Sequence, residues 1–215
     1  MDIKQKLIET GNYLLAHQLA WGTSGNLSAR VDDSHMIMSA SGTFMGGFKE
    51  TDIVKCNIHT GGWEGERKPS KEIPMHKGIY QQRQDAQVIL HSSPFYVTLC
   101  ACSEIEIYSE LFIETMYYLE NINYVDYLHP GSEDLGEVVK KKALDANIIM
   151  MRNHGVILFD KNFSDAIMRL ETLEMACRLI VEAKMGGIKL NKISDRMVED
   201  FRERGIYKPL SIDRK

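Results

Sequence analysis

The stretch "QVILHSSPFYVTLCAC", residues 87–102, decides the fold prediction for this chain. Its first part, 87–91, is a short apolar run that ends on His91, a pattern typical of a buried strand. Pro94 breaks the run, and the apolar residues after it predict a helix over 95–103. The stretch therefore predicts a strand followed directly by a helix, with a terminal histidine that either packs or binds a metal.

The same alternation extends in both directions along the chain. Apolar residues at helical spacing predict helices, and short apolar runs between glycine-bearing turns predict strands. The expected helices lie at 2–19, 72–83, within 130–145, at 163–185 and near 194–204, and the expected strands at 26–31, 35–40, 52–58, near 122–127 and in two runs within 147–159. No internal repeat or linker interrupts this order, so we expect one α/β domain over 1–215, with a C-terminal helix and tail from about 190.

The composition is that of an ordinary globular protein. Hydrophobic residues make up 44% of the 215 residues and charged residues 26%, with a formal net charge of −4. The lysines and arginines are scattered, which gives no basic footprint for nucleic acid. No apolar run approaches the roughly 20 residues of a bilayer span, and the first residues lack the apolar core of a signal peptide. We therefore expect a cytoplasmic protein with no nucleic-acid and no membrane partner.

Three residues are candidates for a metal site: Glu72 at a predicted helix start, His91 at a strand end, and His154 in the turn "RNHG" between two strands. Polar groups at strand ends and helix starts of α/β folds tend to meet in one crevice. A carboxylate and two imidazoles form a ligand set that suits zinc or a similar divalent ion. The alternative stays open, since a single histidine often only binds a backbone carbonyl.

Three other segments combine small residues with hydroxyl or amide side chains: "TSGNLS" (23–28), "SASG" (39–42) and "KPSKE" (68–72). Backbone N–H groups exposed in such segments favour an anion, and Ser70 stands beside a predicted helix start, where a phosphate is stabilised. The alternative is that Ser70 only caps the helix, and that Gly25 and Gly42 only turn the chain.

The motifs "GTSGNLSAR", "SASGTFMG", "PSKEIPMHKGIYQQRQDAQVILHSSPF" and "RNHGVILF" occur in an order and at intervals that resemble the class II aldolase/adducin family, of the fuculose-1-phosphate aldolase type. The resemblance covers roughly residues 5–185. It implies a single-domain class II aldolase-like α/β fold, with a central, mainly antiparallel β-sheet flanked by helices on both faces. It also implies a homotetramer with active sites at subunit contacts and a phosphorylated sugar as substrate.

The resemblance assigns roles to individual residues. Glu72 matches the catalytic acid, and the metal ligands match Glu72, His91 and His154, which would hold Zn²⁺ or another divalent metal such as Mn²⁺ or Co²⁺. Tyr207 resembles a C-terminal tyrosine that some members lend to a neighbouring subunit, and it is the second catalytic candidate. The residues that match phosphate-binding positions are Gly25, Asn26, Ser41, Gly42, Ser70 and Lys71.

The sequence departs from the family pattern at the metal site. Ser93 stands where a second histidine of the strand would bind the metal, and a serine hydroxyl is a poorer zinc ligand than imidazole. We expect a retained but altered metal site. His76, four residues after Glu72 on the same helical face, is a candidate substitute ligand, but a packed or supporting role is the expectation.

Two further departures concern the substrate. Lys71 replaces the second of two paired serines, and its charge suits a phosphate or a substrate carboxylate. An ungapped count puts Phe112 where the aldolases have a tyrosine, so Tyr117 or Tyr118 would have to supply that phenol.

The first functional hypothesis is a metal-dependent lyase, an aldolase that breaks or forms a carbon–carbon bond in a small phosphorylated ketose or sugar acid through an enediolate. The alternative is epimerisation, decarboxylation or dehydration of a sugar phosphate on the same fold, which Lys71 and Phe112 favour. The third hypothesis is a catalytically silent, adducin-like scaffold. Ser93 supports it, whereas the intact anion-binding segments oppose it, because a scaffold has no physical need for them.

Overall fold

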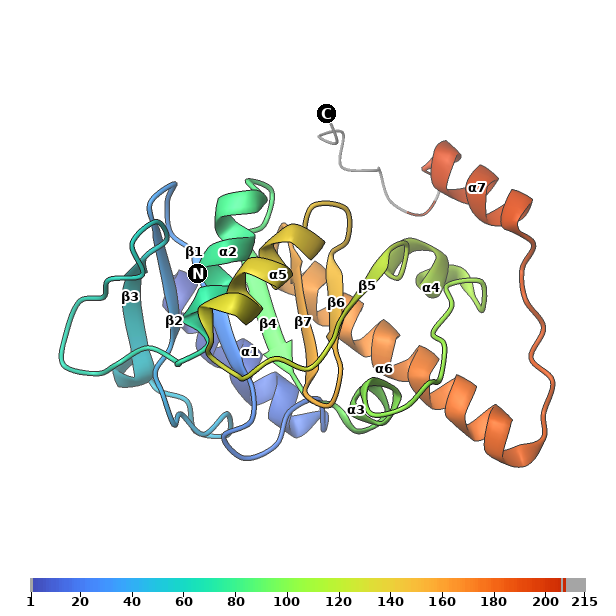
Figure 1. Cartoon of the computed structure of the whole chain (residues 1–215), viewed down its shortest axis with the longest axis horizontal. Coiled ribbons are helices and arrows are strands. Elements are labelled where there is room, and N and C mark those ends of the chain that lie inside the picture. The colour runs from blue at the N-terminus through green and yellow to red at the C-terminus, as the bar shows by residue number, and fades with distance from the viewer. Residues whose placement is uncertain (1, 206, 208–215) are drawn as a thin grey trace.

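A seven-stranded sheet forms the centre of the computed structural model, which describes residues 2–205 and 207. The strand order is β3-β2-β1-β4-β7-β6-β5 (Figure 1). Neighbouring strands are antiparallel except β5 and β6, which are parallel. The strands are β1 (Asn26–Arg30), β2 (His35–Ser39), β3 (Ile53–Asn57), β4 (Val88–Ser92), β5 (Ile122–Val125), β6 (Ile148–Met151) and β7 (Gly155–Asp160).

Helices cover both faces of this sheet. The helices are α1 (Ile3–Ala16), α2 (Ile73–Gln82), α3 (Phe95–Ala101), α4 (Ile113–Tyr118), α5 (Glu133–Lys142), α6 (Phe163–Gly186) and α7 (Asp195–Arg204), with a 3₁₀ turn η1 (Glu50–Asp52) before β3. One apolar core joins the sheet to α1, α3 and α6, and a second joins its other face to α2 and α5. The predicted class, a mainly antiparallel sheet between two helical layers, is confirmed.

Burial of the central strands on both faces explains the apolar run at residues 87–91. All five residues of β4 are buried, as are all of β6 and β7, because each strand has helices packed on both of its faces. Pro94 is the N-cap of α3, in an extended conformation with φ −58° and ψ 155°, so the chain turns sharply from strand to helix. A polar side chain that β4 carries inward must therefore find its partners inside the protein.

Three local features differ from the sequence-based expectation. The first helix ends at Ala16 rather than near residue 19, since Gln18 takes a left-handed conformation with φ 59°. The short helix α4 was not predicted, because six residues carry too little periodicity to be recognised. All four cysteines stand in apolar segments, which predicts core positions; Cys56, Cys100 and Cys177 are buried, whereas Cys102 is exposed.

The C-terminal part of the described chain follows α6 at the left-handed Gly187. An irregular segment leads to α7, which packs against α4. Among the described residues, no helix combines the length and the hydropathy that a membrane crossing requires.

Candidate active site and metal centre

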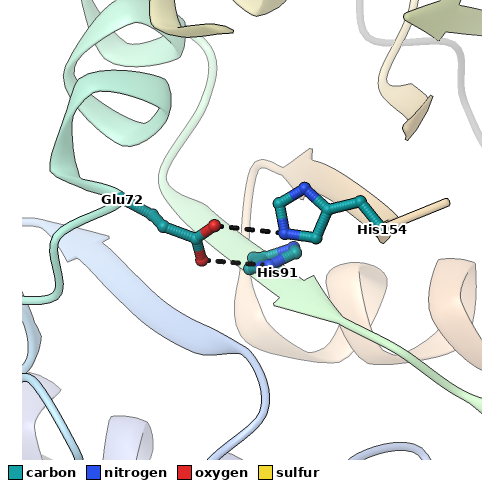
Figure 2. Close-up of side chains that lie close together, drawn as sticks. All are labelled: Glu72, His91 and His154. Carbon is teal, nitrogen blue, oxygen red and sulfur yellow. Dashed lines mark ion pairs between the residues drawn. The ribbon is translucent and has the colours of Figure 1, made fainter. Parts of the chain in front are cut away.

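Glu72 is the N-cap residue of α2 and is brought to the sheet by the segment before it. Pro69 pairs with Ala40, the residue after β2, and Pro74 in the first turn favours helix initiation. The Glu72 side chain is buried, with 6% of the residue exposed, and points toward β4 (Figure 2). A buried carboxylate in this position requires cationic or donor partners.

His91 supplies the first of these partners from β4. Its Nδ1 lies 2.9 Å from the Val156 carbonyl oxygen on β7, and a carbonyl only accepts, so Nδ1 carries a hydrogen. The other ring nitrogen, Nε2, is 3.1 Å from Glu72 Oε2. The backbone contact therefore fixes the ring so that Nε2 faces the carboxylate, which is how metal-binding histidines are commonly held.

His154 supplies the second partner from the turn between β6 and β7. Asn153 and Gly155 on either side have positive φ, 56° and 145°, which makes the turn tight. A Cβ on Gly155 would stand 2.7 Å from the Ser92 carbonyl oxygen, so only glycine allows the turn to approach the end of β4 this closely. This approach places His154 Nε2 3.1 Å from Glu72 Oε1 (Figure 2).

The three side chains form one cluster. One ligand atom from each lies within 4.8 Å of the others, and the two imidazole rings are 4.9 Å apart and nearly perpendicular. Glu72 Oε1 is buried, and its polar neighbour among the described residues is His154 Nε2, at 3.1 Å. Two imidazole nitrogens facing the two oxygens of one carboxylate fit a divalent cation, and this His₂Glu set occurs in catalytic zinc sites.

The charges of the cluster depend on one another. Burial alone would raise the pKa of Glu72, but the adjacent His91 and His154 imidazoles outweigh it and hold that pKa well below its usual range. Burial alone would lower the pKa of His91, but the Glu72 charge and the hydrogen bonds to Glu72 and Val156 raise it instead. Both shifts favour an ion pair between His91 and Glu72 when no metal is bound, and a divalent cation held by these residues would compete with the proton on His91.

Ser93 lies at the edge of this cluster. Its hydroxyl donates to the His154 carbonyl oxygen at 3.3 Å and lies 3.3 Å from the Ser24 hydroxyl. These contacts tie together the turn that carries His154 and the segment that precedes β1. Among the described residues, the group that could hold a metal ion comprises Glu72, His91 and His154, and His76 lies outside it.

The predicted anion-binding residues range from buried to exposed, with Gly25 half-buried. Ser70 is buried, and its hydroxyl accepts from the Glu72 backbone N–H at 3.3 Å. The left-handed Gly25, with φ 86°, packs on the His91 carbonyl. Ser41, Gly42 and Lys71 are exposed, and Gly42 is also left-handed, with φ 74°. Their phosphate contacts stay predictions.

Asn26 differs from the other predicted phosphate ligands because both ends of its amide are occupied by protein. Its Nδ2 donates to Glu72 Oε2 at 2.7 Å, and its Oδ1 lies 2.5 Å from His76 Nε2. Asn26 is directly opposite His91 in the β1–β4 pairing, so both side chains reach the same face of the sheet. The side chain thus serves the carboxylate, a contact that sequence reasoning missed.

The tyrosines lie together in another part of the molecule. Tyr207 packs against Tyr117 at 5.4 Å between ring centroids, and also against Tyr118 and Phe201. Tyr118 is buried, and its hydroxyl donates to Asp165 at 3.3 Å, while Phe112 is the N-cap residue of α4. The structure brings Tyr207 to this aromatic cluster, so its catalytic role stays a prediction that needs a neighbouring subunit.

Comparison with known protein families identifies the fold. A family model described as Class II Aldolase and Adducin N-terminal domain matches residues 5–181. The chain belongs to the class II aldolase/adducin family. Class II aldolases use a divalent metal, which agrees with the chemistry of the Glu72, His91 and His154 cluster.

Relatives within the class II aldolase/adducin family carry two different activities in their names. A 3-oxo-tetronate 4-phosphate decarboxylase of Haemophilus influenzae is 26% identical over 210 residues, which are 95% of this chain and 99% of the relative. An L-fuculose phosphate aldolase of Methanocaldococcus jannaschii is 32% identical over 181 residues, 83% of this chain and 95% of the relative. A solved L-fuculose 1-phosphate aldolase structure superposes with a TM-score of 0.83 at 29% identity and covers 96% of this chain and 97% of its own. The predicted family is confirmed, and these relatives are enzymes.

Proposed function

We propose that this protein is a metal-dependent lyase that breaks a carbon–carbon bond next to a carbonyl group in a small phosphorylated ketose or sugar acid. The observation that carries the proposal is the convergence of Glu72, His91 and His154, with ligand atoms within 4.8 Å of one another. A bound divalent metal supplies Lewis-acid stabilisation of the negative charge that develops on substrate oxygens. We propose Zn²⁺ as that metal, with Mn²⁺ and Co²⁺ as alternatives.

Glu72 is proposed to move the proton. In an aldol cleavage, the hydroxyl of the departing carbon loses its proton as the carbon–carbon bond breaks, and the bonding electrons pass into the carbonyl to give an aldehyde and an enediolate. Proton return to the enediolate carbon completes the reaction. Oxygen Oε1, which is buried beside His154, is proposed to take this proton, whereas Oε2 is held by both Asn26 and His91.

Decarboxylation of a 3-oxo sugar acid phosphate is the second candidate activity. There the bond from the substrate carboxylate to C2 breaks and the carboxylate leaves as CO₂. The electrons of that bond pass through C2 into the ketone at C3, and the resulting enediolate is protonated at carbon. This route has no departing aldehyde and needs no phenol to serve it, so Phe112 in place of tyrosine favours it. Lys71 supports it as well, because its ammonium group can pair with a substrate carboxylate.

A homotetramer in the cytoplasm completes the proposal. Phe95 and Leu99 are exposed on one face of α3, and Met175 and Leu179 are exposed on one face of the neighbouring α6. Each pair has the four-residue spacing of a single helical face, and adjoining exposed apolar residues support self-association. The partners proposed are a phosphorylated sugar and further copies of this chain, without nucleic acid or membrane.

The decisive experiment measures metal content and products together. The chain is purified without chelator, its metals are quantified, and it is incubated with a panel of ketose 1-phosphates and a 3-oxo acid phosphate. Release of an aldehyde identifies an aldolase, and release of CO₂ identifies a decarboxylase. Absence of metal, of ligand-induced stabilisation and of turnover would favour the catalytically silent, adducin-like scaffold and refute the proposal.

A further inference from the structure

A buried hydrogen-bond chain of Tyr80, Ser28, His76 and Asn26 stands behind Glu72. The Tyr80 and Ser28 hydroxyl oxygens are 3.0 Å apart, and Ser28 Oγ is 2.7 Å from His76 Nδ1. His76 Nε2 is 2.5 Å from Asn26 Oδ1, and Asn26 Nδ2 is 2.7 Å from Glu72 Oε2. All four residues are buried, with His76, Ser28 and Tyr80 fully inaccessible.

The chain arises from the register of one helix against one strand. Glu72, His76 and Tyr80 are four residues apart at the start and on one face of α2, while Asn26 and Ser28 are two apart on one face of β1. The two polar rows interdigitate, so each buried polar group finds its partner on the other element. Such a row within an otherwise apolar interface costs stability unless every member is satisfied.

The donor and acceptor roles along the chain are fixed by chemistry. The Glu72 carboxylate, flanked by two imidazoles, accepts only, so Asn26 must present its NH₂ group to Oε2 and its carbonyl oxygen to His76. A carbonyl oxygen also accepts only, so His76 carries its hydrogen on Nε2. Burial lowers the pKa of His76 to about 3, so the ring is neutral and Nδ1 accepts from the Ser28 hydroxyl. Ser28 in turn accepts from Tyr80, and every donor points toward Glu72.

We propose that His76 is a positioning residue of the metal centre, which acts through Asn26 to fix Oε2 of Glu72 as an acceptor. The inference rests on the proposed metal-dependent function of the same cluster. If the Asn26 amide turned over, its NH₂ group would face the Nε2–H of His76 and its oxygen would face Oε2 of Glu72, so both hydrogen bonds would be lost. The amide is therefore fixed, and it holds the carboxylate plane between His91 and His154. Oxygen Oε1, whose contact is to His154, is thereby the oxygen outside this amide network that can take up a metal or a proton.

Two amide substitutions of His76 separate positioning from packing. In His76→Gln the side-chain NH₂ reaches the position of Nε2 and can still donate to Asn26, whereas His76→Asn reaches only the position of Nδ1 and keeps the contact to Ser28. Zn²⁺ affinity of the metal-free protein is measured by competition with a chromophoric chelator, after circular dichroism has confirmed the fold of each variant.

We expect His76→Asn to weaken Zn²⁺ binding by about 10–100-fold, the usual effect of losing a group that orients a ligand, and His76→Gln to stay close to the wild type. On the best substrate found, the loss in His76→Asn falls on kcat rather than KM. Unchanged affinity in a folded His76→Asn variant, or an equal loss in both variants, would overturn the inference.

A measurement on the wild-type chain does not depend on variant folding. ¹⁵N NMR of the histidine rings reports which nitrogen carries the hydrogen, and we expect Nε2–H for His76; an Nδ1–H tautomer would overturn the inference. A chain that shows the predicted tautomer and the predicted affinity pattern but turns over no sugar phosphate refutes the proposed function alone.

Discussion

The cluster of Glu72, His91 and His154 and the predicted anion-binding residues are both assembled from distant parts of the sequence, but they are held in different ways. Glu72, His91 and His154 come from a helix start, a central strand and a tight turn, and they contact one another directly inside the protein. Ser41, Gly42 and Lys71 are exposed residues of turns and loops. The proposed chemistry thus lies inside the sheet, which has helices on both faces. The proposed phosphate contacts of Ser41, Gly42 and Lys71 lie on its exposed rim, where sequence can change at little cost in stability.

The largest effect should follow from removing the charge of the buried centre. Glu72→Gln should lower kcat/KM by about 10²–10⁴-fold, the range for loss of a proton-transferring group, because an amide cannot hold the transferred proton. The measurement is steady-state kinetics on the substrate that the panel identifies. Retained activity in this variant would mean that the buried cluster does not carry the chemistry, and the contrast with the rim would be lost.

Removing one proposed metal ligand should weaken Zn²⁺ binding. His154→Ala should weaken Zn²⁺ affinity by more than the roughly 10–100-fold typical of losing a supporting contact, because a direct ligand is lost. The matched control is His59→Ala, which removes an exposed histidine and should leave the affinity unchanged. Equal affinities in the two variants would contradict the assignment of His154.

Adding a metal ligand should strengthen Zn²⁺ binding. Ser93→His restores an imidazole beside His154, and Zn²⁺ should bind roughly tenfold more tightly, equivalent to about 1.4 kcal/mol. The competition titration used for His76 measures this change. An affinity that stays at the wild-type value would show that this position does not face the cation.

The proposed role of Lys71 in substrate binding is tested with the variant Lys71→Ser. The matched control is Lys141→Ser, which replaces an exposed lysine on α5. Lys71→Ser should raise KM for an anionic substrate by about tenfold or less, through loss of one charge-assisted contact, and leave kcat nearly unchanged. It should also reduce the salt dependence of KM. A drop in kcat with constant KM would place Lys71 in the chemistry and weaken the division between centre and rim.

The smallest effect is a pH dependence of the metal-free protein. The folded pKa of His91 is raised, so its stabilising contribution is complete below its unfolded pKa of about 6.5 and is lost as pH rises through the folded value. The folded pKa of Glu72 is lowered, so its contribution is present above about pH 4.5 and is lost only as pH falls through the folded value. Thermal unfolding should show a decline in Tm above neutral pH that is absent in His91→Gln and in the Zn²⁺-loaded protein.

Sequence reasoning recovered what has a local signature and missed what depends on packing. Residues 87–102 predicted β4 and α3 because an apolar run and a proline are local signals. The six-residue helix α4 is stabilised by its packing on α6 and α7, so its own residues carry little indication of it.

The same distinction applies to the site. Glu72, His91 and His154 were proposed from motif order, but the His76–Asn26 contact depends on how α2 lies against β1. A polar residue at every fourth position of α2, opposite two polar residues of β1, was the available signal. It pointed to a buried network only once the two elements were known to face each other.

The left-handed Gly25 links the rim to the centre, and this limits how the protein can be re-engineered. A side chain at this position would collide with the carbonyl of His91, in a backbone conformation that other residues rarely adopt. Any substitution would push the end of β4 and displace His91 from its partners. Libraries that aim at a new substrate should therefore leave Gly25 constant and diversify Ser41 and Lys71.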